Sequence, residues 1–296
     1  MMGTKVRSMT GYGRGEHIAE DRKFTIELKS VNHRYNDINI KLPRSLASLE
    51  DKIKKQIMKQ VFRGKTDVYI SFETFALDDV AVKLNETLAR AYVEKLKFLQ
   101  ESLDLEQGNI LELAAKFPDV ITVEKPQKDE AVIWAALLPA LEEAVTRFVA
   151  MREMEGEALK RDILGKGVRI LELVQIVKAR SPLVVEEYRE KLTHRLKELL
   201  DGVDVDPQRI ATEVAIFADR GCVDEEITRL ESHLVQLAHI LEKGGQVGRK
   251  LDFLVQEMNR ESNTIASKAN DIQIVQATIE LKSEIEKIRE QIQNLE

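Results

Sequence analysis

The residue types gathered between Asp219 and Lys268 are those from which metal and polyanion sites are built. Carboxylates, an imidazole, amides and guanidinium groups fall in two stretches of helical apolar spacing, which a glycine-rich turn at Gly244 and Gly245 joins. Packing a helix pair needs only an apolar stripe and a solvated polar face, so it does not require this mixture. Charge-rich solvated helices are nevertheless common. The run is therefore a candidate site for a divalent cation or a polyanion, with a plain solvated helix pair as the alternative.

The second stretch, residues 251–268, places two carboxylates one helical turn apart. Glu257 and Glu261 are spaced i, i+4 beside the apolar stripe, so they share one edge of the helix. Carboxylates at this spacing can hold a hard divalent ion through oxygen. They can equally form surface ion pairs with Lys250 and Lys268 on the same edge, which is the commoner arrangement on charged helix faces. Both arrangements stay open.

The first stretch carries a histidine on a charged face. Glu226, Arg229 and His233 are spaced i, i+3, i+7 and share that face, while Glu225 is placed to pair with Arg229. Histidine titrates near neutral pH, so His233 can serve as a metal ligand or a general base. A lone histidine is more often a structural hydrogen-bonding group. The spacing alone does not decide between these roles.

Cations beside the glycine-rich turn can bind phosphate. Arg249 and Lys250 follow Gly248 directly, which lets backbone N–H groups and two cations face one anion. The turn lacks the spacing of a P-loop and the Ser or Thr after the lysine, and from spacing alone a plain helix–helix turn is the better explanation. Arg229 and Arg260 can grip phosphate in bidentate fashion.

The N-terminal part of the chain is basic although the whole carries a net charge of -6. Residues 1–75 hold 15 lysines and arginines against 9 acidic residues; the rest, out of totals of 45 and 51, holds 30 against 42. A nucleic-acid backbone would therefore meet this part first, unless the excess belongs to one solvated helix over 52–59. Candidate contacts at the predicted strand ends are Arg7, His33, Arg34, Arg63 and Lys65, with Tyr12 as a stacking platform or a core residue.

Periodicity predicts strands first and helices after. Alternating apolar residues predict strands within 6–18, 24–28, 35–42 and 66–75, and antiparallel pairing is the simplest arrangement. The glycines at 11, 13 and 15 permit bulges or a close backbone approach. Ser45 is placed to cap a helix that Gly64 follows as its C′ residue, and Asn85 to cap another.

From Glu130 onward the pattern is helical. Pro182 should kink or interrupt it, and Asp206-Pro207 should restart it as N-cap and first helical residue. The last helix has apolar residues in a heptad seam, which should pack on a helix of this chain or of a neighbour: Leu281, Ile285, Ile288, Ile292 and Leu295.

These elements predict an α+β protein: an N-terminal antiparallel sheet with helices, then a long helical arm and a C-terminal helical domain. We place the domains at 1–155, 156–206 and 207–296 and expect an oligomer, because long helices with several apolar stripes need cover. Cys222 is the single cysteine, which excludes an internal disulfide framework and suits a reducing cytoplasm. No apolar run is long enough to cross a membrane and no secretory leader is evident, so we expect a soluble cytoplasmic protein with no membrane partner.

Longer strings resemble the YicC/YloC family of bacterial proteins. They are SMTGYGRGE from Ser8, ELKSVNHRYNDI from Glu27, LPRSLASLED from Leu42, RGKTDV from Arg63, DEEITRLESHL from Asp224, GGQVGRKLDFLVQEMNRESNTIASKA from Gly244 and EIEKIREQIQNLE from Glu284. The resemblance implies a cytoplasmic, divalent-metal-dependent endoribonuclease, with manganese favoured. It also implies a hexameric ring that encloses RNA in a chamber. Cys222 departs from the family, which often has an acidic residue there.

Taken together, the residues and the resemblance lead us to expect an endoribonuclease that uses Mn²⁺ or, less favoured, Mg²⁺ on RNA inside a homohexamer. The expected metal ligands are Glu226, His233, Glu257 and Glu261, and the expected catalytic residues are Glu257, Glu261, His233 and Arg260. The expected RNA contacts are Arg7, His33, Arg34, Arg63, Lys65, Arg229, Arg249 and Lys250. Two alternatives remain: a non-catalytic RNA-binding adaptor that promotes decay by another nuclease, and a purely structural ring or coiled-coil assembly.

Overall fold

The structure, a computed structural model, describes residues 5–19, 22–33, 35–75, 81–104, 108–124, 129–199, 206–245 and 247–296. Its N-terminal elements are β1 (Gly11–Ala19), β2 (Arg22–Val31), β3 (Asn36–Lys41), η1 (Arg44–Leu49), α1 (Glu50–Met58) and β4 (Gly64–Thr74). The next are β5 (Ala81–Leu84), α2 (Glu86–Ser102), α3 (Ile110–Lys116) and β6 (Ile121–Glu124). The helical remainder is α4 (Glu130–Leu199), α5 (Pro207–Gly221), α6 (Asp224–Lys243), α7 (Gly248–Lys268) and α8 (Ile272–Ile292). The predicted α+β class is confirmed.

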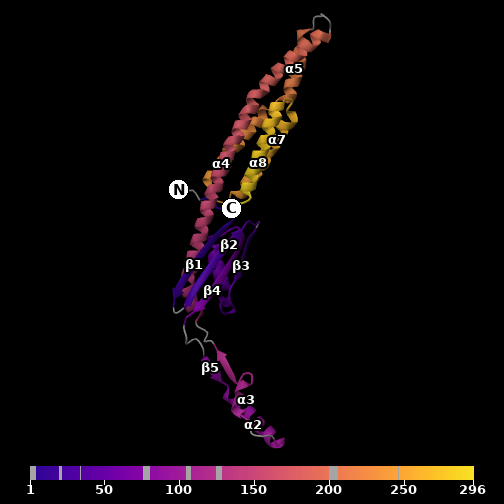
Figure 1. The fold of residues 1–296 in the computed structure, drawn as a ribbon. Helices are drawn as coiled ribbons and strands as arrows, with labels where there is room; N and C mark the ends of the chain where they lie inside the picture. Colours follow the sequence, from indigo (N-terminus) through magenta and orange to yellow (C-terminus); the bar gives the residue numbers. More distant parts are fainter. Residues whose placement is uncertain are drawn as a thin grey trace.

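One helix, α4, is the spine of an elongated molecule (Figure 1). It has 70 residues, so it extends over roughly 105 Å at the usual helical rise. Its first half buries Leu141 and Phe148 against the main sheet, and its second half buries Ile163 and Ile170 against the C-terminal helices. The helix runs without a break through residue 156, where we placed the first domain boundary.

Pro182 does not interrupt α4, so of the two predicted outcomes, a kink or an interruption, the interruption is wrong. The proline lies on the exposed side of the helix, where its ring meets solvent. Side-chain contacts lie on either side of the proline. Arg180 pairs with Glu187 across the proline at 2.6 Å, and Tyr188 stacks on Phe217 of α5 with ring centroids 3.8 Å apart. Tertiary contacts thus override the local helix-breaking tendency.

The main sheet has the strand order β1-β2-β4-β3. The predicted antiparallel pairing is right for β1 with β2 and for β2 with β4. It is wrong for β3, which pairs with β4 in parallel, Ile38 opposite Thr66. The chain crosses from β3 to β4 through η1 and α1, and a helical crossover of this kind returns the chain to the same end of the sheet.

The glycines of β1 allow this strand to lie directly on α4. A Cβ on Gly13 would stand 2.2 Å from the carbonyl oxygen of Ala144, and one on Gly15 would stand 2.1 Å from that of Ala140. The expected close backbone approach is therefore confirmed. Gly64 has a different role from the predicted helix end: α1 stops at Met58, and Gly64 opens β4 with φ +106°. Ser45 lies inside η1, whose N-cap is Pro43.

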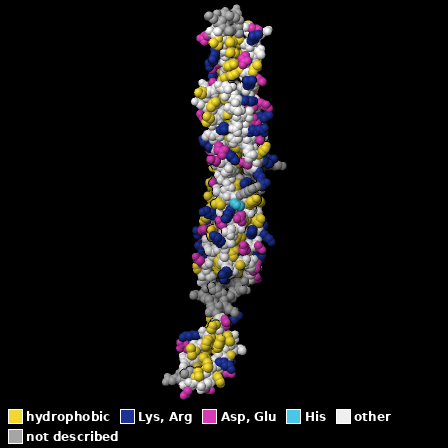
Figure 2. Space-filling model, turned by 90° about the vertical axis from the view of Figure 1, so that its right-hand side faces the viewer, with side chains coloured by type: hydrophobic (Ala, Val, Ile, Leu, Met, Phe, Trp, Pro, Cys, Tyr) yellow, Lys and Arg dark blue, Asp and Glu magenta, His cyan; other side chains and the backbone are white. Residues whose placement is uncertain are grey.

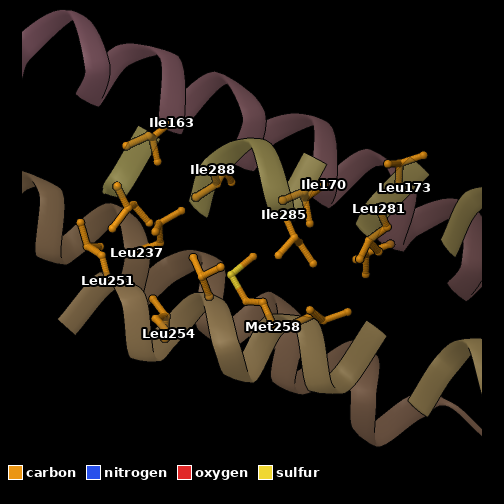
Figure 3. Close-up of a cluster of buried hydrophobic side chains, with 14 of the residues drawn as sticks. Ile163, Ile170, Leu173, Leu237, Leu251, Leu254, Met258, Leu281, Ile285 and Ile288 are labelled. Atoms are coloured by element: carbon orange, nitrogen blue, oxygen red, sulfur yellow. The ribbon is translucent and has the colours of Figure 1, made fainter. Parts of the chain in front are cut away.

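The C-terminal core confirms the heptad seam within this chain. Figure 3 shows Leu281, Ile285 and Ile288 of α8 pointing into a cluster shared with α4 and the neighbouring helices, and all three are fully buried. The turn at Gly244 is confirmed, with Gly244 at φ +65°. The restart at Asp206 is confirmed too, because its side chain accepts a hydrogen bond from the Gln208 N–H.

A small module formed by β5, α2, α3 and β6 lies beyond the main sheet, at the opposite end from α5 (Figure 1). Asn85 caps α2 as predicted, accepting from the Leu88 N–H at 3.1 Å. No residue of α2 is buried. The β5–β6 pair and α3 were not predicted, since each is too short for a clear periodic signal. The sequence also predicts a polar loop at 125–129 and a helix end at 201–202, and these positions fall mostly or wholly outside the described residues.

Candidate functional site

The charged run predicted as a site folds as the antiparallel pair α6 and α7, and ion pairs join the two helices. Arg229 of α6 reaches Glu261 of α7 at 3.3 Å and also pairs with Glu225. Lys268 of α7 reaches Glu226 of α6 at 2.8 Å. The hydrogen bond with Glu261 raises the pKa of Arg229 above its ordinary value, and Glu226 does the same to the pKa of Lys268. The cations here are held by carboxylates of the same chain.

Glu257 and Glu261 share an edge of α7 but differ in their surroundings. The Glu261 side chain is only 4% exposed and faces Arg229, whereas that of Glu257 is 30% exposed and lies 3.9 Å from Arg260 one turn on. The predicted pairing of these carboxylates with Lys268 is not formed, because Lys268 binds Glu226 and the Cys222 carbonyl oxygen instead. Glu257 is thus the more accessible carboxylate.

Two buried polar atoms on α6 lack hydrogen-bond partners: Oε2 of Glu226 and Nδ1 of His233. The pairs Arg229–Glu261 and Glu226–Lys268 set α6 and α7 antiparallel, which places the stretch 257–261 of α7 across from His233. Buried polar atoms are normally hydrogen-bonded, so each of these two atoms can take an ordered water or a ligand. In the part of the chain that the structure describes, however, no three His, Cys, Asp or Glu residues come together as a metal-binding group. The expected set of metal ligands therefore stays a prediction. Two of its atoms, Oε2 of Glu226 and Nδ1 of His233, have no partner, but its residues do not form a metal-binding group among those described.

A second constellation lies where the two ends of the chain meet. Arg152 of α4 is buried and donates to Glu296 at 3.2 Å, to the Arg63 carbonyl oxygen at 3.3 Å and to the Ser8 carbonyl oxygen. Burial lowers the pKa of Arg152, against the opposing effect of Glu296. The Glu296 carboxylate also accepts from the Phe62 N–H at 3.2 Å. This ion pair fixes the loop before β4 against residues 7–9 and the C-terminal segment.

A cavity of about 320 Å³, here called the junction cavity, opens where the loop before β4 meets the C-terminal segment. Its lining combines the start of α7, residues around β3 and before β4, and the last residue of the chain: Tyr35, Asn36, Phe62, Arg63, Gly248, Arg249 and Glu296. A neighbouring hollow of about 280 Å³ shares Phe62 and Glu296 and adds Lys5, Arg7 and Lys59. Arg63 and Arg249, both predicted to contact RNA, are thus brought together from distant parts of the sequence.

The other predicted contacts have varied surroundings. Arg7 pairs with Glu153 at 2.9 Å, as does Lys5 at 3.0 Å. The two cations outweigh the raising effect of burial and lower the pKa of Glu153. His33 is exposed, with Nδ1 3.2 Å from the Tyr35 carbonyl oxygen. Arg34 lies outside the described residues. Lys65 and Lys250 are exposed.

The predicted RNA-contacting residues differ in whether a carboxylate of this chain pairs with them, rather than in the density of charge around them. Figure 2 shows lysine and arginine side chains mixed with acidic ones along the face it presents, and apolar side chains gathered on the small module. Tyr12 is 43% exposed, so it is not a core residue. Sequence reasoning missed Tyr35, Asn36, Phe62 and the Arg152–Glu296 pair. Their local sequence carries no signal, because the cavity exists only once distant segments meet. Within the described residues, no helix combines the length and the apolar character needed to cross a membrane.

The chain matches family descriptions over most of its length. Residues 6–161 match "Endoribonuclease YicC-like, N-terminal region" and residues 177–296 match "Endoribonuclease YicC-like, C-terminal". A Clostridioides difficile protein named "Probable endoribonuclease YicC" is 44% identical over 290 residues, which are 98% of this chain and 99% of that protein. A Haemophilus influenzae protein of the same name is 35% identical over 291 residues, 98% of this chain and all of that protein. The resemblance drawn from the motifs is confirmed, and the chain belongs to the YicC-like endoribonuclease family.

Proposed function

We propose that this protein is an endoribonuclease that cleaves single-stranded or structured RNA and needs a divalent cation, Mn²⁺ in preference to Mg²⁺. One observation carries the proposal. The helix α7 begins at the junction cavity with Arg249 and carries Glu257 and Glu261 farther along, roughly 12 and 18 Å away by helical rise. One rigid element thus holds phosphate-binding and acid–base groups at a fixed separation. The names of the two relatives support the same activity.

In this proposal the residues divide into binding and chemistry. Arg63 and Arg249 neutralise phosphate charge, and bidentate guanidinium contacts suit that task. Glu257 is accessible, and Nδ1 of His233 on the neighbouring helix has no partner among the described residues, so each can exchange a proton with the reacting group. Arg260 beside Glu257 stabilises negative charge that develops on the phosphate.

A bound divalent ion would lower the pKa of a water molecule or polarise the scissile phosphate. Glu226, His233, Glu257 and Glu261 are the donors available for it. They are not assembled among the described residues, and two of them hold Lys268 and Arg229. These ion pairs would have to open before the donors could surround one ion. We therefore derive no chemical step through the ion.

The test is cleavage of end-labelled RNA by the purified full chain, with Mn²⁺ and with EDTA. We expect products only with the cation, and we expect Glu257→Ala and Glu261→Ala to lose cleavage while they retain RNA binding. Glu286→Ala is the matched control, because Glu286 is exposed and pairs with Arg289 at i, i+3 as Glu257 does with Arg260. Equal activity of all three variants would point to a contaminating nuclease.

The alternative is a non-catalytic adaptor that binds RNA and promotes its decay by another nuclease. The ion pairs that hold Glu226 and Glu261 favour the adaptor, because these two carboxylates are not open to a cation in this arrangement. RNA binding without cleavage under every cation condition would select this alternative. Absent or salt-insensitive RNA binding would instead leave a purely structural assembly.

We further propose that six copies assemble and that the protein works in the cytoplasm. Large apolar side chains on exposed faces of α4 and α8 support assembly; they include Val168, Leu183, Ile272 and Ile279. The exposed free thiol of Cys222 suits a reducing compartment. Native mass spectrometry of the full chain checks the copy number, and a monomer at micromolar concentration would contradict it.

A further inference from the structure

The junction cavity has the parts needed to hold one unit of an RNA strand. We propose that it binds a single nucleotide, with the phosphate between Arg63 and Arg249 and the base against Tyr35 and Phe62. The inference rests on the proposed action on RNA and deepens it by naming the subsite. At about 320 Å³ the cavity lies at the small end of the range for ligand pockets, which fits one nucleotide and excludes a duplex.

The cations of the cavity are available to a ligand. In the described part of the chain, neither the Arg63 nor the Arg249 guanidinium forms an ion pair, and Nε of Arg63 is buried without a partner. A Cβ on Gly248 would lie 3.1 Å from Nη1 of Arg63, so this guanidinium rests against the start of α7. The first N–H groups of a helix have no partner within the helix and add to the attraction for an anion.

The carboxylate that also lines the cavity does not neutralise these arginines. Glu296 is buried, and its oxygens accept from Arg152 and from the Phe62 N–H. The negative charge of the Glu296 side chain is therefore compensated by Arg152, which does not line the cavity. The ion pair keeps the acid in place while Arg63 and Arg249 face the open space.

Aromatic rings and an unsatisfied amide give the cavity a place for a base. Tyr35 is 64% exposed and Phe62 is 52% exposed. Together the two rings present a large apolar surface beside the arginines of the cavity. Nucleobases stack on such rings whatever their identity. Asn36 donates through Nδ2 to the Val61 carbonyl oxygen at 3.0 Å, which leaves its Oδ1 buried without a donor. A nucleotide supplies that donor through an exocyclic amine or the 2′-hydroxyl.

The experiment measures binding of a short fluorescein-labelled single-stranded RNA by anisotropy, in EDTA so that no cleavage occurs. Arg249→Ala should weaken binding about tenfold and lower the slope of log affinity against log salt by about 0.7. Lys250→Ala removes the same charge one residue away, outside the cavity lining, and should weaken binding less than about threefold. Arg249→Lys should fall between, because it keeps the charge and loses the bidentate contact.

The second part of the experiment tests the aromatic rings with the double variant Tyr35→Ala, Phe62→Ala, which should weaken RNA binding about tenfold. Phe75→Ala, an exposed aromatic outside the cavity, should change nothing. Equal losses for Arg249→Ala and Lys250→Ala, or no loss for the aromatic double variant, would overturn the subsite. Cleavage by the wild type with Mn²⁺ is scored separately, so the nucleotide site can fail while the endoribonuclease proposal stands.

Discussion

The α6–α7 pair and the junction cavity are both rich in arginine, and they differ in what those arginines contact. On α6–α7, Arg229 is held by Glu261 and Glu225, and Lys268 by Glu226. At the junction, Arg63 and Arg249 line open space, and the neighbouring acid is matched by the buried Arg152. The density of charge along the sequence is higher in the first region. We expect the capacity to bind an external polyanion to be higher in the second, because a cation already paired has less to gain from a phosphate.

The largest expected effect is on the ion pair that builds the junction. Arg152→Ala leaves the Glu296 carboxylate buried and removes donors from the Ser8 and Arg63 carbonyl oxygens. We expect it to lower the free energy of unfolding by about 3–5 kcal/mol, measured by urea denaturation. Arg147→Ala, which breaks an exposed pair with Glu143 on the same helix, should lower it by less than about 1 kcal/mol. Equal losses would mean that the junction contributes no more than a surface contact.

Arg229→Ala tests the paired side of the comparison. We expect RNA affinity in EDTA to change by less than about twofold, because the guanidinium is already occupied by carboxylates. The urea midpoint should fall, since the largely buried Glu261 loses its partner. A loss of RNA affinity as large as that of Arg249→Ala would show that partnering does not decide which cations bind.

Glu153→Gln should free cations for RNA. Glu153 holds Lys5 and Arg7, which line the hollow beside the cavity. The variant is expected to raise RNA affinity about two- to fivefold and to steepen its salt dependence. Glu143→Gln, on an exposed pair with Arg147 away from both hollows, is the control. An unchanged affinity for Glu153→Gln would contradict the idea that released cations bind RNA.

The smallest expected effect is on the acid side of the stability profile. The folded-state pKa of Glu153 is lowered, so the ionised side chain stabilises the fold at pH values above its unfolded-state pKa, which is about 4.3. This contribution is lost as the pH falls through the folded-state pKa. Thermal unfolding between pH 6 and pH 3 should therefore show a slightly shallower decline for Glu153→Gln than for the wild type. Parallel curves would mean that the carboxylate gains nothing from Lys5 and Arg7.

Local signals in the sequence predicted much of the fold. The caps at Asn85 and Asp206 and the seam ending at Leu295 depend on neighbouring residues only, and the structure confirms them. The direction of β3 and the continuity of α4 at Pro182 depend on contacts from elsewhere, so local reasoning was wrong about the strand direction and about an interruption of the helix.

The candidate site shows the same division between features that neighbouring residues determine and features that depend on distant contacts. Residue type and spacing named Arg63, Arg249, Glu257 and His233 as candidates, but could not show which cations would be paired. Arg152 gave no signal at all, because an arginine within a helical pattern looks like a surface residue until Glu296 folds back onto it.

Single-turnover cleavage of labelled RNA with Mn²⁺, measured over a range of protein concentrations, tests the division between junction and α6–α7 most directly. We predict that Arg249→Ala raises the half-saturating protein concentration about tenfold and leaves the maximal rate unchanged. Glu257→Gln should lower the maximal rate about a hundredfold or more at an unchanged half-saturating concentration. The account is contradicted if Arg249→Ala lowers the maximal rate, or if Glu257→Gln cleaves at the wild-type rate once RNA is saturated.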